Sequence, residues 1–180
     1  MNKKIAFIIA LLTIGLVSRF MPHYPNFTAI GAVALLGGSL LRKPLEGIIL
    51  PLVILFVSDL ILNNLIYAGE SFTVFYQGAA YIYIAVVLSA LIGRFVTKLN
   101  PKNFLVLSIA SSLVFFLISN FGVWKTGLLY PATGQGLIAS YIAAIPYGLS
   151  HLAGTLTYGV VIMAAYKYMV KEQSTSFTRI

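Results

Sequence analysis

Long runs of apolar residues, separated by short polar ones, fill most of this 180-residue chain. A helix of about 20 apolar residues spans the hydrocarbon of a bilayer, because it satisfies its own backbone hydrogen bonds. The second of the six segments predicted here is short and rich in glycine and alanine, so it either packs steeply inside the bundle or spans only part of the membrane. The six segments are Lys4–Phe20, Phe27–Leu41, Leu45–Tyr67, Phe75–Thr97, Phe104–Lys125 and Ala144–Tyr168. We therefore expect a single transmembrane domain over residues 1–170 and a polar cytoplasmic tail over residues 171–180.

The composition excludes several classes of protein. Hydrophobic residues make up 59% of the chain and charged residues 9%, whereas about a quarter of the residues of a soluble domain are charged. So few charges do not cover a water-exposed surface, which excludes a soluble enzyme, a disordered tail and a nucleic-acid-binding domain. The chain has no cysteine, which excludes disulfides, thiolate chemistry and cysteine-ligated zinc. The predicted fold class is an all-α integral membrane protein, a bundle of about six transmembrane helices.

The distribution of positive charge predicts the orientation of these helices. The net charge is +8, with 12 Lys and Arg residues. If the amino terminus lies in the cytoplasm, only Arg19 and Lys125 fall outside, as the positive-inside rule requires. No convincing small-x-small cleavage site follows Lys3 and Lys4, so the first segment is read as an uncleaved helix. Both termini are then cytoplasmic, and the basic inner face attracts anionic membrane lipid. The ten cations on that face are Lys3, Lys4, Arg42, Lys43, Arg94, Lys98, Lys102, Lys167, Lys171 and Arg179.

Polar side chains gather at one predicted depth, near the outer ends of the helices. Charged and amide groups are costly inside a membrane, so their convergence from five segments predicts an outward-facing pocket lined by aromatic and polar groups. Spacings of four residues place several of them on shared helix faces. We expect Asp59, Asn63, Asn120, Trp124, His151, Tyr147 and Tyr81 to bind substrate, and Arg19, His23 and Asn26 to serve as a lid or as charge partners.

Each of these residues also has a purely structural interpretation. Asp59 would pair with Arg19 or His151 to fix helix packing, and Arg19 alone would extend to the lipid headgroups. His151 would form a hydrogen bond between helices. Trp124 and Tyr147 would belong to the aromatic belt that membrane proteins carry at the interface.

Sequence signatures of other chemistry are absent from the chain. There is no Gly-x-x-x-x-Gly-Lys-Ser/Thr phosphate loop and no His-Glu-x-x-His metal motif. Ser58 and Ser150 lack the nucleophile elbow that a Ser-His pair would need. We therefore expect no catalytic residues, no metal site and no cofactor. If the protein moves a solute, the energy comes from a partner or from an ion gradient.

Several motifs resemble an uncharacterised bacterial family of six-helix membrane proteins. They are Arg19-Phe-Met-Pro-His-Tyr-Pro-Asn-Phe-Thr-Ala-Ile-Gly-Ala32, Ser58-Asp59-Leu60, Asn120-Phe-Gly-Val-Trp124, Tyr130-Pro131 and Ala144-Ile-Pro-Tyr147. That family looks similar to the substrate-binding S components of energy-coupling-factor vitamin transporters, including the solitary cobalamin transporters. The resemblance to the family rests on the first motif above all. The step to S components rests on size, helix number and the placement of the site.

This resemblance implies a protein of the bacterial cytoplasmic membrane that captures a vitamin or its precursor from outside. It also implies a coupling transmembrane protein and ATPase subunits as partners. Ala6 and Ala10 match the Ala-x-x-x-Ala motif with which S components face the coupling protein, and Ala34 and Gly38 offer a second close-packing face. The solitary cobalamin transporters ligate cobalt through a cysteine, and that chemistry does not transfer to a chain without one.

Two other functions stay open on the sequence alone. A structural membrane subunit of a cell-envelope or cell-shape complex would use the polar cluster as a packing network. A solitary proton-coupled carrier would use Asp59 as its titrating group. An intramembrane enzyme ranks last, because no complete catalytic constellation is present.

Overall fold

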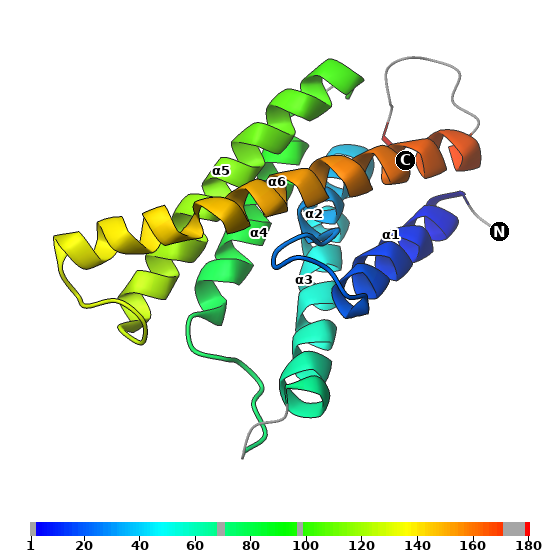
Figure 1. Ribbon diagram of the computed structural model, residues 1–180. Coiled ribbons are helices and arrows are strands. Elements are labelled where there is room, and N and C mark those ends of the chain that lie inside the picture. The colour runs from blue at the N-terminus through cyan, green and yellow to red at the C-terminus, as the bar shows by residue number, and fades with distance from the viewer. Residues whose placement is uncertain (1–2, 68–70, 97–98, 171–178) are drawn as a thin grey trace.

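The protein is all-helical, as the computed structural model shows for residues 3–67, 71–96, 99–170 and 179–180 (Figure 1). The prediction of an all-helical bundle of about six helices is confirmed over these ranges. The predicted tail falls mainly on residues 171–178, which lie outside the described part of the chain. The elements are α1 (Lys3–Phe20), α2 (Ile30–Leu40), α3 (Pro44–Ile61), η1 (Leu62–Ile66), α4 (Ala79–Arg94), α5 (Pro101–Thr126) and α6 (Gly134–Val170).

Local sequence signals set where several helices begin and end. Pro44 and Pro101 open α3 and α5, where a missing N–H costs nothing and the fixed φ suits a helix. The side chain of Asn100 caps α5 by accepting a hydrogen bond from the Asn103 N–H at 2.8 Å. Gly127 ends α5 with a φ of 69°, a left-handed conformation that glycine adopts without strain. These signals account for the sharp ends of the helices.

Two helices differ in extent from the predicted segments. The fourth was expected over 75–97, but α4 begins only at Ala79, since Gly78 before it has a left-handed backbone with a φ of 89°. The sixth was expected to begin at Ala144, but α6 begins at Gly134 and continues through Pro146. Within the described ranges, three helices are long and apolar enough to cross a membrane, namely Pro44–Ile66, Pro101–Thr126 and Gly134–Met169. The apolar helices α2 and α4 are shorter.

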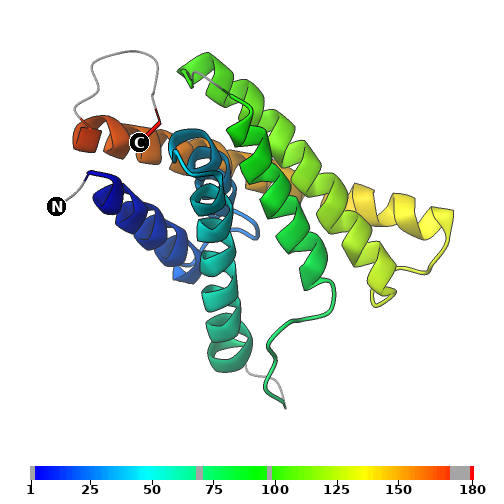
Figure 2. The ribbon, with the colours of Figure 1, turned by 180° about the vertical axis from the view of Figure 1, so that it is seen from behind.

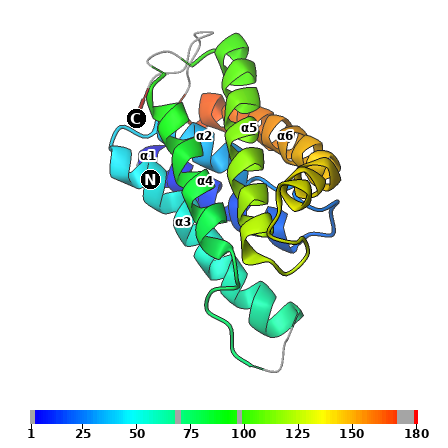
Figure 3. The ribbon, with the colours of Figure 1, turned by 90° about the vertical axis from the view of Figure 1, so that its left-hand side faces the viewer.

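Helix α2 lies at the centre of the bundle and contacts every other α-helix. All eleven of its residues are buried, so the helix packs inside the bundle. Internal packing was one of the two alternatives predicted for this segment. Helices α3 and α4 lie side by side in front of it when the molecule is seen from behind, and α6 crosses the bundle at a steep angle (Figures 1 and 2). The continuous unit of α3 and η1 extends farther than its neighbours at one end (Figure 3).

The close approach of α2 to α4 depends on glycine. A Cβ atom added to Gly38 would lie 2.0 Å from the backbone oxygen of Ala90, and one added to Gly93 would lie 2.0 Å from that of Leu35. Real Cβ atoms do not approach backbone oxygen so closely, so neither position accepts a side chain while the helices stay in place. Gly38 and Ala34 are therefore used within the protein, and the expectation that they offer a face to a partner is wrong.

The last two residues contact the end of the bundle where α2 and α4 terminate. The guanidinium of Arg179 donates to the backbone oxygens of Ser39 at 3.0 Å and Arg94 at 2.6 Å. The Ile180 N–H donates to the Leu40 oxygen at 2.9 Å. Cations suit helix C-terminal ends, whose carbonyl groups lack partners within the helix. These contacts join the C-terminal ends of α2 and α4.

The substitution Gly38→Ala should destabilise the protein through this contact. Adding one methyl group in a closely packed interior costs about 1–3 kcal/mol of the free energy of unfolding. Thermal unfolding in detergent measures the effect. The matched control is Gly134→Ala at the start of α6, where an added Cβ meets nothing within 4 Å. Equal melting temperatures for both variants would contradict the close packing of α2 against α4.

Candidate functional site

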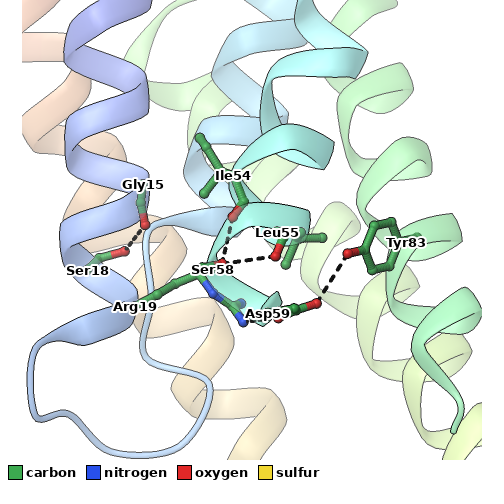
Figure 4. A network of polar contacts seen from close by, with 8 residues as sticks. All are labelled: Gly15, Ser18, Arg19, Ile54, Leu55, Ser58, Asp59 and Tyr83. Atoms are coloured by element: carbon green, nitrogen blue, oxygen red, sulfur yellow. Dashed lines mark hydrogen bonds and ion pairs between the residues drawn. The ribbon is translucent and has the colours of Figure 1, made fainter. Parts of the chain in front are cut away.

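An ion pair joins three helices at the end of the bundle opposite Arg179. Arg19 at the end of α1 pairs with Asp59 on α3, and the hydroxyl of Tyr83 on α4 donates to the second carboxylate oxygen of Asp59 at 3.3 Å (Figure 4). The side chains of Arg19 and Asp59 are only 16% and 6% exposed. Of the two partners considered for Asp59, Arg19 and His151, the structure shows Arg19. A carboxylate at this depth is retained because both of its oxygens are bound.

The backbone around Arg19 is held in place by short polar contacts. Ser18 donates from its hydroxyl to the Gly15 oxygen and accepts from the Ala29 N–H at 2.9 Å, which ties the start of α2 to the end of α1. Asn26, in the connecting loop, has a φ of 67°. Asparagine tolerates this left-handed conformation better than most residues. The loop can therefore turn sharply enough to bring α2 back beside α1.

A cavity of about 450 Å³ lies beside the ion pair. Its volume is within the range of about 300–1,000 Å³ that is usual for small-molecule sites. Every helix contributes to its wall, so the cavity exists only when the whole bundle is assembled. It is lined by Arg19, His23, Pro25, Asn26, Thr28, Ile30, Leu55, Asp59, Leu62, Asn63, Tyr67, Tyr76, Ile82, Phe115 and His151.

The π-helical turn η1 places two polar residues in this wall. Its wider winding is closed by the hydrogen bond from the Tyr67 N–H to the Leu62 oxygen at 2.8 Å. Asn63 lies within η1, and both Asn63 and Tyr67 line the cavity. Single π-turns inserted in helices are rare and occur frequently at functional sites. The turn lies in the cavity wall and gives the end of α3 a wider winding there.

An aromatic stack forms the opposite part of the wall. The rings of Phe115 and His151 lie 4.0 Å apart and are nearly parallel, with an interplanar angle of 7°. His151 is almost completely buried. Both residues line the cavity and are largely buried, so the stack makes this part of the wall aromatic.

Three residues of the wall have buried polar atoms without a hydrogen-bond partner in the described part of the chain. The atoms are Nε of Arg19, Nδ2 of Asn63 and Nε2 of His151. An unsatisfied buried polar group costs about 1–3 kcal/mol, so native proteins satisfy nearly all of them. Six further buried polar atoms of the described chain lack a partner and lie away from the cavity, on Glu46, Ser108, Ser111, Ser112, Ser150 and Thr155. Unpaired polar atoms are therefore spread through the helix contacts and do not by themselves mark the cavity as a site.

Tyr76 lines the cavity from the loop that precedes α4 and was not among the predicted site residues. Desolvation by the surrounding groups, together with the nearby Asp59 carboxylate, raises the pKa of Tyr76 to about 12. Its phenol is therefore neutral at physiological pH and remains a hydrogen-bond donor. Phe115 and Thr28 were missed as well. Neither Phe115 nor Tyr76 stands out in a chain with 12 Phe and 11 Tyr residues.

The structure brings together six of the predicted residues around the cavity and places four elsewhere. The six are Arg19, His23, Asn26, Asp59, Asn63 and His151; the four are Tyr81, Asn120, Trp124 and Tyr147. Asn120 donates to the Phe116 oxygen of its own helix at 2.7 Å. Tyr147 is 43% exposed and stacks on Tyr24.

Trp124 and Tyr81 have packing roles. Trp124 donates from its indole N–H to the backbone oxygens of Pro131 at 3.1 Å and Thr133 at 3.2 Å, which holds the loop between α5 and α6. A Cβ atom added to Gly122 would lie 2.6 Å from the Tyr81 side chain, so Tyr81 fills the space at that position of α5. Both contacts stabilise the outer parts of the bundle.

The site contains no arrangement of metal ligands within the described ranges. No three His, Cys, Asp or Glu side chains there lie close enough to hold a metal ion. The geometry supports recognition of a bound molecule through hydrogen bonds, one ion pair and stacking.

Comparison with protein families matches residues 1–177 to one described as "Family of unknown function (DUF6580)". No curated protein and no solved structure matches the chain.

Separating the members of the ion pair should destabilise the protein strongly. Removal of one partner of a buried pair costs about 3–5 kcal/mol, so Asp59→Asn and Arg19→Gln should each lower the free energy of unfolding by about 3 kcal/mol. The double variant should cost less than the sum, with a coupling of more than about 1 kcal/mol. Thermal or denaturant unfolding of the four proteins measures this coupling.

The matched control for this cycle is the pair of Lys4 and Glu46, which lie 2.7 Å apart with side chains 28% and 29% exposed. Its coupling should stay below about 1 kcal/mol, because partly exposed pairs gain little. A coupling for Arg19 and Asp59 as small as that of the control would contradict a stabilising role of the buried pair.

Proposed function

This chain belongs to the family DUF6580, and we propose that it is a membrane protein that captures a small solute in the cavity beside Arg19 and Asp59. The observation that carries the proposal is the cavity itself, whose wall combines a buried ion pair, two stacked rings and the amide of Asn63.

Insertion in a membrane is supported by composition and by the exposed faces of the helices. Three helices are long and apolar enough to cross a bilayer. Residues such as Leu105, Leu113, Leu149 and Val160 are about half exposed or more on their outer faces. Apolar surface on this scale is costly in water and favourable in lipid. In the proposed orientation both termini are cytoplasmic and the cavity opens to the outside, as the distribution of cations favours.

The residues of the wall suggest the chemistry of the solute. The charges of Arg19 and Asp59 compensate each other, so the site favours a molecule without a large net charge. The stacked rings of Phe115 and His151 belong to the wall and would contact an aromatic ring of the solute. Asn63 and Tyr76 supply hydrogen-bond donors and acceptors to the edges of that ring. A vitamin or vitamin precursor with a heteroaromatic ring has these properties.

Uptake of the solute is proposed to follow the scheme of the S components that the sequence resembles. A coupling transmembrane protein and ATPase subunits would drive release to the inside. Ala6 and Ala10 on α1, each partly exposed, supply a small-residue surface on which a partner helix can pack closely. The described residues contribute no nucleotide-binding loop of their own, so energy from a partner is needed for transport against a gradient.

The ion pair also favours a second candidate function, a structural subunit of an envelope complex. Arg19, Asp59 and Tyr83 tie α1, α3 and α4 together, which a packing network would do. That function predicts no bound solute, so the same experiment distinguishes the two proposals.

A solute should be recovered from the purified protein. We expect mass spectrometry of small molecules released from the detergent-purified protein to find one compound near a 1:1 ratio. Asp59→Ala and Asn63→Ala should each lower its retention about tenfold or more, since a lost partner at a buried polar site costs about 1–3 kcal/mol. Asn120→Ala is the control, because Asn120 bonds within its own helix and does not line the cavity.

Equal recovery from the wild type and all three variants would remove the cavity from the proposed function. The proteins would also be incubated with a mixture of vitamins before the measurement. If no compound then exceeded background in any of them, the result would favour the structural subunit.

The proposed orientation can be tested with single cysteines, because the chain has none. Lys125→Cys, at the end of α5, should react in intact cells with a membrane-impermeant maleimide. Lys102→Cys, at the start of the same helix, should react only after permeabilisation. Both positions are exposed, so burial does not account for a difference. The reverse pattern would place the cavity on the cytoplasmic side and contradict capture from outside.

A further inference from the structure

A second concave surface lies between α1 and α3, and no residue of its lining is shared with the cavity of Asp59. It is a groove of about 440 Å³ whose walls are apolar, with Ile8 and Leu12 on one side and Ile49, Leu50 and Val53 on the other. Val53 is 43% exposed and Ile49 is 45% exposed, so the groove is open along its length. In the membrane it would face the hydrocarbon of the inner half of the bilayer.

The shape of the groove follows from two contacts between the helices. Towards the outer end α1 and α3 touch, since a Cβ atom on Gly15 would lie 2.6 Å from the Ile54 side chain. Towards the other end the ion pair of Lys4 and Glu46 bridges the helices at 2.7 Å. Between these contacts the groove is lined by branched apolar side chains of both helices. From Glu46 to Val53 it extends over roughly 10 Å, at 1.5 Å per residue.

Positive charge lies at the end of the groove bridged by this ion pair. Lys43, which immediately precedes α3, is part of the lining, and Arg42 beside it is exposed. The charges of Lys4 and Glu46 compensate each other, so Lys43 and Arg42 leave a net positive end. An apolar groove that ends in two cations matches the acyl chain and phosphate of an anionic lipid.

We propose that this groove binds one acyl chain of an anionic phospholipid of the inner leaflet, with its phosphate beside Lys43 and Arg42. The proposal rests on the membrane orientation given above but not on solute capture. It places the lipid on a different flank of α1 from Ala6 and Ala10. Those two residues lie two positions from Ile8 and Leu12, roughly 200° around the helix at 3.6 residues per turn. A bound lipid and a partner helix on the alanine face can therefore be present together.

Native mass spectrometry of the detergent-solubilised protein tests the proposal, with phosphatidylglycerol or phosphatidylcholine added in equal amounts. The wild type should retain one phosphatidylglycerol in preference to phosphatidylcholine. Lys43→Gln should lower this retention about fivefold, which corresponds to the ~1 kcal/mol that one basic residue contributes near an anionic lipid. Val53→Trp should abolish it by filling the groove.

Matched controls separate the groove from the rest of the surface. Lys125→Gln removes a cation at the other end of the bundle, and Val160→Trp enlarges an exposed side chain on α6 that is 60% exposed. Both should retain phosphatidylglycerol as the wild type does. Asn63→Ala, which alters the solute cavity and leaves the ion pair between α1 and α3 in place, should retain it too, so failure of the solute site and failure of the lipid site are distinguishable.

Three results would overturn the proposal. The first is equal retention of phosphatidylglycerol by the wild type and Lys43→Gln. The second is equal retention of the two lipids by the wild type. The third is a dimer that forms in place of the lipid adduct and is lost in Val53→Trp, which would assign the groove to a second copy of the chain. If Val53→Trp does not fold, Lys43→Gln with its Lys125→Gln control still decides the question.

Discussion

Complete burial of α2 is the constraint on which the arrangement of the other helices depends. Its eleven residues have no exposed face, so the surrounding helices must approach it from every side. Approach at this distance requires residues without side chains at the contacts, as Gly38 provides against the Ala90 backbone. Because α2 is short, the helices around it converge at its position and diverge beyond it. The cavity lies where they diverge, at the end where α2 begins.

The ion pair of Arg19 and Asp59 stands at this point of divergence. Burial of the two charges costs hydration free energy. Their attraction for each other and the hydrogen bond from Tyr83 offset this cost. Replacement of such a pair by apolar residues of similar size is often neutral or stabilising, so stability alone does not account for it. Under the proposed function, the pair would also orient a polar molecule in the adjoining cavity.

Much of the fold was predictable because apolar helix-length segments are a strong signal. The helix order followed from hydropathy, and the density of glycine and alanine in 27–41 left internal packing as one of two alternatives for that segment. The helix limits at Ala79 and Gly134 were missed because they depend on a left-handed glycine and on a tolerated internal proline. Such features have no periodic signature.

The candidate site was predictable in its ion pair and in part of its wall. Intramembrane charge singles out Asp59 and Arg19, and the four-residue spacing adds Asn63. Asn120 does not line this cavity, because its amide bonds to the preceding turn of its own helix, which spacing does not reveal. Trp124 does not line it either, and its indole bonds to backbone oxygens of a loop. The π-turn η1 leaves no mark in the hydropathy pattern.

The most direct test of solute capture is an experimental structure of the protein purified from its native membranes without added ligand. We expect non-protein density for one compact, ring-containing molecule in the cavity, within hydrogen-bond distance of Asn63 and beside the stack of Phe115 and His151. The carboxylate of Asp59 should remain bound to Arg19. A cavity closed by inward movement of Tyr67 and Tyr76, with the polar atoms of Asn63 and His151 satisfied by neighbouring helices, would contradict the account.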